Sequence, residues 1–430
     1  MKDIGLHLVY TPPIVTHERT AHDYLSDFSA EIPLYTKTSK LLEFLDSWSS
    51  NAETLQERIV QLWISLYEHD YIELEDVDAM RDWIVALMEL GYKFPQVINA
   101  TKVSPRAQPV FQNQPHRALP ASASTSTSGI LSSGSTGKRF SGEKIRSYTY
   151  NEQIKSNSRS GMIMKHLFPS PVGDGSTFFG KDCKRWSVVT TIHDPNESIL
   201  GVAELQNSCL VIVGDTITND AVYETLAKSK KNVYYLSASY QKKFLMNNSP
   251  FIKSMPFKSF ARKNIGYLFA ISNGAQLIYD FDDDNVLKTM KDKETIPSPF
   301  FLNQDFDVNH HSILFQFSKR NSSHASDSHG NGKPFNPLPH MGPSHEYTWP
   351  RGFPIDKLAE NFEQETPEYA YGDLPYSAVG VIQSLCNGDP DTDALFRMTR
   401  AKSTSFSFDS SSTTNNLLVP INAYAPYNAQ

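Results

Sequence analysis

Short apolar runs alternate with helical patterns in the second half of the chain, and this alternation most constrains the fold. The runs expected to form buried strands are 187–192, 209–213, 232–236 and 276–279. A helical pattern at 262–272 precedes the last of them and ends at Asn273-Gly274. Apolar strands separated by helices are typical of a mostly parallel sheet covered on both faces. We therefore predict an α/β fold with flanking helices.

An acidic run follows the last predicted strand directly. The segment 280–284 reads Asp-Phe-Asp-Asp-Asp, and its crowded carboxylates repel one another unless solvent or a bound cation relieves the repulsion. Ligands of parallel sheets bind beyond the carboxyl ends of the strands, where this run lies. Mg²⁺ and Mn²⁺ prefer oxygen ligands and leave coordination positions for phosphate oxygens. We predict a metal site at Asp280, Asp282 and Asp283, with a solvated acidic turn or an incidental Ca²⁺ site as the alternative.

Other polar residues stand near the same predicted edge. Thr190 and Thr191 end the first strand and could line a pocket, although ordinary strand-end polarity explains them equally well. Asp215 follows the second strand, where a carboxylate can accept hydrogen bonds from a ribose or a base. Arg262 and Lys263 begin the helix before the acidic strand and could offset diphosphate charge. A solvated helix face is the alternative for these two.

The first part of the chain has a different pattern. Residues 17–97 show apolar positions at helical spacing, which predicts a small helical module. The three amphipathic stretches are 41–48, 55–67 and 77–88, the last followed by Gly91 as a stop. Its tryptophans are expected to pack in the core. Residues 98–180 include a Ser/Thr-rich run and several prolines, which predicts a disordered, low-complexity linker.

Composition and charge exclude several classes of protein. The net charge of -7 argues against a general nucleic-acid binder, and 39% hydrophobic residues argue against global disorder. No apolar run is long enough to span a bilayer, and no apolar segment follows Met1 as a secretory signal would require. The three cysteines lack CxxC spacing, so a zinc ribbon is unsupported.

Motifs along the second half, between residues 186 and 427, resemble the STELLO family of Golgi glycosyltransferase-like proteins. They follow the order in which the family has them. The matching segments are 186–192, 211–215, 262–271, 274–275, 278–283, 349–354, 387–396 and 419–424. In the acidic run the family pattern Tyr-Asp-x-Asp-Asp is matched from Tyr279 to Asp283, and Asp284 is an additional acid.

The resemblance implies a fold and an activity. It implies a GT-A-like domain over 181–430 that binds a nucleotide-diphospho-sugar through Mn²⁺ or Mg²⁺. The partners implied are a nucleotide-sugar donor, a glycan or polysaccharide acceptor and, for the plant members, cellulose synthase complexes. The location implied is the Golgi lumen. The alternative is a non-catalytic scaffold that assists assembly or trafficking of polysaccharide synthases, because one fold can serve both roles.

Two further motifs of the resemblance contain candidate site residues. Asp391 and Asp393 could supply a general base near the acceptor. The alternative is a turn, because Gly388-Asp389-Pro390-Asp391 has strong turn chemistry. Arg351 could reach a phosphate or carboxylate, and a structural corner is the alternative.

The sequence also departs from the family. No membrane anchor precedes the predicted domain, and the chain stops at 430, where family members continue, so we expect a domain truncated at its C-terminus. Residues 17–97 resemble the module that follows the transferase domain in the family. We therefore expect a piece of a longer tandem protein, with the tail of one unit before the body of the next.

Overall fold

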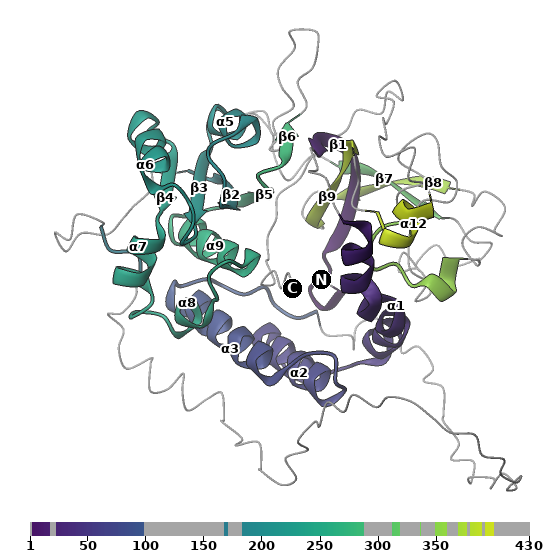
Figure 1. Ribbon diagram of the computed structural model, residues 1–430. Helices are drawn as coiled ribbons and strands as arrows, with labels where there is room; N and C mark the ends of the chain where they lie inside the picture. Colours follow the sequence, from purple (N-terminus) through teal and green to yellow (C-terminus); the bar gives the residue numbers. More distant parts are fainter. Residues whose placement is uncertain are drawn as a thin grey trace, which may run out of the picture. The chain divides into compact units, whose positions relative to one another are not determined.

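The computed structural model describes about half of the chain in detail (Figure 1). The described residues are 2–17, 23–98, 167–170, 183–287, 312–318, 336, 349–358, 369–375, 379–388 and 392–399. Residues 1–98 and 164–430 group into one compact unit, so the helical segment and the sheet-bearing segment belong together. Most of the predicted linker 98–180 lies outside the described residues. Within those residues no helix has the length and apolarity needed to cross a bilayer.

Four parallel strands form the central sheet of the second half. In chain order they are β2 (Arg185–Thr191), β3 (Cys209–Gly214), β4 (Val233–Leu236) and β5 (Leu277–Asp280). Their order in the sheet is β4-β3-β2-β5, and every neighbouring pair is parallel. The strands are apolar because both faces of the sheet are covered. The predicted α/β fold with a mostly parallel sheet and flanking helices is confirmed.

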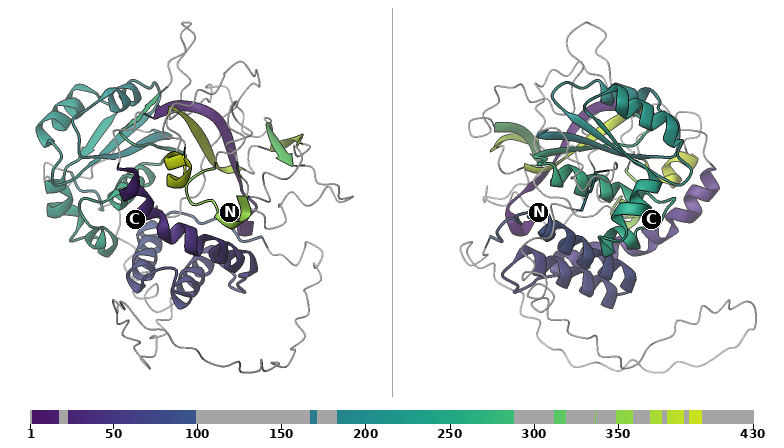
Figure 2. Two further views of the ribbon diagram at one scale, coloured as in Figure 1. Left: turned by 45° about the vertical axis from the view of Figure 1, so that its right-hand side comes forward. Right: turned by 90° about the vertical axis from the view of Figure 1, so that its left-hand side faces the viewer.

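Helices cover the sheet on both faces, as the right-hand view of Figure 2 shows. Helix α9 (Lys263–Ser272) lies on one face, where a Cβ atom at Gly266 would stand 2.5 Å from Val188 Cγ1. Helices α5 (Glu197–Ala203) and α6 (Asp220–Ser229) pack on the opposite face. The alternating strand residues divide between the faces, since Val188 contacts α9 while Val189 belongs to the α5 and α6 cluster.

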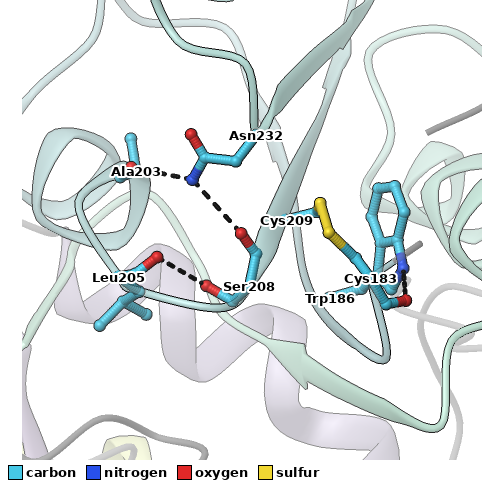
Figure 3. The surroundings of a disulfide bond; sticks show 7 residues. All are labelled: Cys183, Trp186, Ala203, Leu205, Ser208, Cys209 and Asn232. Atoms are coloured by element: carbon cyan, nitrogen blue, oxygen red, sulfur yellow. Dashed lines mark hydrogen bonds between the residues drawn. A yellow bond between two sulfur atoms is a disulfide. The ribbon is translucent and has the colours of Figure 1, made fainter. Parts of the chain in front are cut away.

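A disulfide joins the amino ends of two sheet strands (Figure 3). Cys183 precedes β2 and Cys209 begins β3, and their Cα atoms are 6.0 Å apart. The indole nitrogen of Trp186 donates to the Cys183 carbonyl at 2.8 Å. Nearby, Asn232 donates to the carbonyls of Ala203 and Ser208. These contacts stabilise the end of the sheet at which its strands begin, opposite the end that carries the acidic run.

The N-terminal segment contains three helices, α1 (Tyr24–Ser47), α2 (Leu55–Glu68) and α3 (Leu74–Glu89), where the sequence shows helical spacing. Asp23 caps α1 by accepting from the backbone N–H of Leu25 at 3.0 Å. Gly91 has a φ of 76°, a left-handed conformation that suits glycine and follows the end of α3. Trp83 of α3 is buried, as expected, and its ring lies 5.1 Å from that of Phe251 in α8 (Pro250–Ser254), whereas Trp48 and Trp63 are only half-buried.

The N-terminal strand β1 (His7–His17) was not predicted from the sequence. It lies between β6 (Asn285–Leu287) and β9 (Val379–Gly388), antiparallel to β6 and parallel to β9. The register with β9 shifts between Thr11 and Val15, where Pro12-Pro13 stands. Proline is tolerated at such irregularities because it has no N–H to donate to the ladder.

Shorter elements complete the described structure. The remaining strands, β7 (Ser312–Ser318) and β8 (Tyr369–Pro375), pair antiparallel. The remaining helices are the 3-10 turns Lys2–Ile4, Phe260–Arg262 and Ile355–Lys357, α7 (Ala238–Tyr240), the π-helical turn Gln241–Leu245 and α12 (Ala394–Thr399). Part of the segment predicted as linker is buried, because Phe168 packs edge-on against Phe269 of α9 at 5.1 Å.

Candidate functional site

The acidic loop, residues 280–284, lies between the end of β5 and the start of β6. The first turn of α5 and its N-cap hold the backbone of this loop. Ser198 donates its hydroxyl to the Asn285 carbonyl at 2.8 Å, and Asn196 donates its amide to the Asp283 carbonyl at 2.5 Å. Phe281 of the loop is buried, and its ring stacks on that of Tyr279. The loop is therefore built into the edge of the sheet, unlike a fully solvated turn.

Lys263 is the counter-ion of the first two acids. Its ammonium lies 2.8 Å from Asp280 Oδ1 and 2.6 Å from Asp282 Oδ1, and its side chain is only 2% exposed. Burial alone would lower the pKa of Lys263, but the two carboxylates outweigh it and raise the pKa above its usual range. The lysine is therefore charged and holds the two aspartates together.

The other two acids of the loop turn to different partners. Asp283 accepts from the Thr191 hydroxyl at 2.5 Å, and burial raises the pKa of Asp283 although that hydrogen bond opposes the rise. Asp284 Oδ2 lies 2.9 Å from His17 Nε2. Each carboxylate of the loop thus has a defined neighbour contributed by α9, β2 or β1.

The charged groups of this loop are carboxylates, whose oxygens are the ligand type that hard divalent cations prefer. Four carboxylates face one buried lysine and one histidine, so acidic groups outnumber basic ones in the loop. Lys263 contacts one oxygen of Asp280 and one of Asp282. Asp282 remains half-exposed at 49%. In the described parts of the chain, however, no three acidic, histidine or cysteine side chains converge as a ready-made cage.

The polar side chains of Thr190 and Asp215, at the strand ends, form hydrogen bonds within the protein. The Thr190 hydroxyl donates to the Val213 carbonyl at 3.0 Å and so joins β2 to β3. Asp215 is buried and accepts from the backbone N–H groups of Thr216 and Lys258, at 2.5 and 2.6 Å. These contacts organise the loop after β3. Of the predicted polar residues, Thr191 and Lys263 contact the acidic loop directly.

Arg262 lies away from the acidic loop although it precedes Lys263 in sequence. Its guanidinium is fully buried, donates to Gln241 and to the Met255 carbonyl, and stacks on Phe257 at 3.7 Å. Burial lowers the pKa of Arg262 to about 10. The side chain therefore fastens the π-helical turn to α9. Its predicted contact with a diphosphate stays a prediction.

A second buried acidic cluster forms around Asp393. Tyr35 of α1 donates toward Glu31 Oε2 at 2.9 Å and lies 3.2 Å from Asp393 Oδ1. Glu31 also accepts from the backbone N–H of Ala394 at 2.8 Å, and Arg351 Nε lies 2.9 Å from its other oxygen. Burial raises the pKa of Asp393, and Glu31 adds to the rise. Helix α1 thus covers the predicted general base, and Arg351 binds a carboxylate of the protein.

Asp391 and Asp393 are the candidate site residues of segment 387–396. Asp391 lies outside the described residues. Asp393 Oδ2 is buried and has no hydrogen-bond partner among the described residues, as is also true of Trp349 Nε1. Trp349 and Asp393 are joined through the backbone, since the Asp393 N–H donates to the Trp349 carbonyl at 3.3 Å. The roles of Asp391 and Asp393 stay predictions.

The shifted pKa of Asp393 predicts pH-dependent stability. Because its pKa is raised in the folded state, the folded protein holds this proton more tightly than the unfolded chain does. An ionised Asp393 therefore costs stability, and the cost grows as pH rises through the carboxyl range toward the raised value. We expect Asp393→Asn to gain stability relative to the wild type between pH 4 and pH 8. Thermal unfolding of both proteins across this range measures it, and a constant difference would contradict the shift.

The described fold is that of an α/β protein with an acidic loop at the carboxyl edge of a parallel sheet, where such folds bind ligands. Residues 2–117 match the family model described as STELLO glycosyltransferases. The chain is also similar to two proteins of Arabidopsis thaliana, "Probable glycosyltransferase STELLO2" and "Probable glycosyltransferase STELLO1". Each is 28% identical over 232 residues, which cover 53% of this chain and 26% of the relative. The resemblance to the STELLO family is confirmed.

The extent of these matches differs. The family model covers the N-terminal segment, including β1 and the three helices. The match to each relative takes in 53% of the chain, more than the segment 2–117 contains, so it includes residues beyond that segment. The chain spans about a quarter of the length of these relatives.

Proposed function

We propose that this protein is glycosyltransferase-like and binds the diphosphate of a nucleotide-diphospho-sugar at the acidic loop, in glycan or polysaccharide synthesis. The observation that carries the proposal is the loop itself. Its carboxylates stand at the carboxyl edge of a parallel sheet and keep an excess of negative charge beyond Lys263. A GT-A-type site of this kind would take Mn²⁺ or Mg²⁺ with the donor, and Golgi lumenal residence follows from the family resemblance.

The residues divide the work of such a site. Asp282 and Asp283 are the acids that would hold a cation, which when bound would offset the negative charge of the departing diphosphate. Lys263 keeps Asp280 and Asp282 at a fixed spacing through its two ion pairs. Thr191 orients the Asp283 carboxylate. An acceptor hydroxyl would lose its proton to a base, for which Asp393 and Asp391 are the candidates, and Asp393 would first have to emerge from beneath α1.

A second candidate function is a non-catalytic scaffold for polysaccharide synthases. The observation that favours it is the buried ammonium of Lys263, which neutralises part of the loop without any cation. Coverage of Asp393 by α1 points the same way, because a general base must reach its substrate. In this case the loop would stabilise the fold and would bind no donor.

Titration of the full chain with Mn²⁺ and a panel of nucleotide sugars separates the two functions. We expect saturable donor binding that requires Mn²⁺ and falls at least about tenfold in Asp282→Asn and in Asp283→Asn, because each loses a charged oxygen ligand. Isothermal titration calorimetry measures it. Asp78→Asn, an exposed acid on α3, is the matched control and should bind as the wild type does. Absence of binding to every donor would favour the scaffold.

A further inference from the structure

The end of strand β1 lies between the two motifs that the sequence marks as functional. In the antiparallel pair His17 stands opposite Asn285, the residue that follows the acidic loop. In the parallel pair His17 stands opposite Gly388, which lies in the matching segment 387–396 that also contains Asp391 and Asp393. Strands β1 and β9 end, and β6 begins, at the same end of this three-stranded sheet. The acidic loop before β6 and the residues after β9 therefore adjoin the same end of the sheet.

The side chain of His17 reaches the acidic loop from this position. Its Nε2 lies 2.9 Å from Asp284 Oδ2, and the imidazole is only 13% exposed. Asp284 Oδ1 accepts from the Asn285 side chain at 3.0 Å, so both oxygens of this acid are held. The contact joins residues 267 positions apart in the chain.

Asp284 is also the last residue of the acidic loop and directly precedes β6. The backbone N–H of Asn285 donates to the Asp282 carbonyl at 3.0 Å, which closes the loop immediately before the strand begins. A group that holds Asp284 therefore fixes the point at which the loop joins the sheet. Lys263 fixes the other end of the loop through Asp280.

We propose that His17 is a positioning residue of the acidic loop: strand β1 carries it to Asp284, and through that contact the N-terminal segment completes the candidate site. The inference deepens the proposed function, since the loop would be the diphosphate-binding element. The N-terminal segment and residues 164–430 belong to one compact unit. Residues 2–17 belong to the segment that matches the STELLO family model.

Hydrogen–deuterium exchange on the full chain tests this role without any ligand. In His17→Ala we expect the backbone of 281–287 to exchange about tenfold faster, because a hydrogen bond to a charged group is lost. Asp284→Asn should give a similar local increase, and the double variant should add little to either change, as expected for two residues that act through one contact. His17→Gln, which keeps a donor, should restore most of the protection.

Two controls separate positioning from general stability. His69→Ala removes a histidine at the end of α2 and should leave 281–287 unchanged. Exchange in β3 and α9 should stay at the wild-type rate in His17→Ala. Unchanged exchange at 281–287 would overturn the proposal, and so would an equal increase throughout β3 and α9, which would mark His17 as an ordinary core residue.

Mn²⁺ titration of the same variants distinguishes failure of the His17 proposal from failure of the proposed function. If the wild type binds Mn²⁺, we expect weaker binding in His17→Ala and recovery in His17→Gln. If the wild type binds neither Mn²⁺ nor any donor, the proposed function fails. The exchange experiment still decides whether His17 positions the loop.

Discussion

Replacement of Lys263 by methionine is expected to destabilise the protein by about 3 kcal/mol. Methionine keeps the apolar stem of the side chain but leaves Asp280 and Asp282 as neighbouring carboxylates without their buried counter-ion. The partial exposure of both acids keeps the cost at the lower end of the range for broken buried pairs. Urea unfolding followed by circular dichroism measures the change in the free energy of unfolding.

A matched control and a compensating variant sharpen this result. Lys253→Met, on the exposed side of α8, should change stability by less than about 0.5 kcal/mol. The triple variant Lys263→Met, Asp280→Asn, Asp282→Asn should recover much of the loss, because it removes the unpaired charges together. An unchanged urea midpoint for Lys263→Met would show that solvent alone can screen these acids.

Gly266→Ala is the second substitution with a large expected effect. Alanine usually stabilises a helix interior, but here the added Cβ would lie 2.5 Å from Val188 Cγ1 and 3.0 Å from Val213 Cγ2. Helix α9 would have to move away from β2 and β3, at a cost of about 1–3 kcal/mol. Thermal or urea unfolding of the full chain checks it.

Gly201→Ala in α5 provides the opposite expectation. Nothing lies within 4 Å of a Cβ at Gly201, so the intrinsic preference for alanine should prevail there and stabilise the protein by about 0.5–1 kcal/mol. Val188→Ala combined with Gly266→Ala should relieve part of the clash. If both glycine variants were stabilised alike, the close packing of α9 on the sheet would be contradicted.

Much of the described fold could be predicted from local patterns. The runs at 187–192 and 209–213 are apolar because they are covered on both faces, and they form β2 and β3. The stop signals were equally informative: Gly91 and Gly274 both adopt positive φ, at 76° and 80°, after α3 and α9. Such signals are local, since periodicity and glycine placement act over a few residues.

The candidate site was predicted less completely. The acidic loop was predicted from its sequence and its place after a strand, and the structure brings Thr191 and Lys263 to it. Arg262 is adjacent to Lys263 in sequence, yet its side chain contacts Gln241, because Arg262 ends a 3-10 turn, Lys263 begins α9, and neighbouring side chains leave the backbone in different directions. Glu31 and Tyr35 were not predicted, since they lie on an N-terminal helix with no local sign of the motif they contact.

By itself, the sequence determined the α/β class, the main helices and strands, and the position of the acidic loop at a strand end. The similarity to STELLO proteins could also be recognised from the sequence alone. Only the tertiary structure decided which side chains meet that loop, and that β1 lies between β6 and β9. The physical reason is that these contacts join residues distant in the chain, from 17 positions apart for Lys263 and Asp280 to 267 for His17 and Asp284, and local periodicity does not encode them.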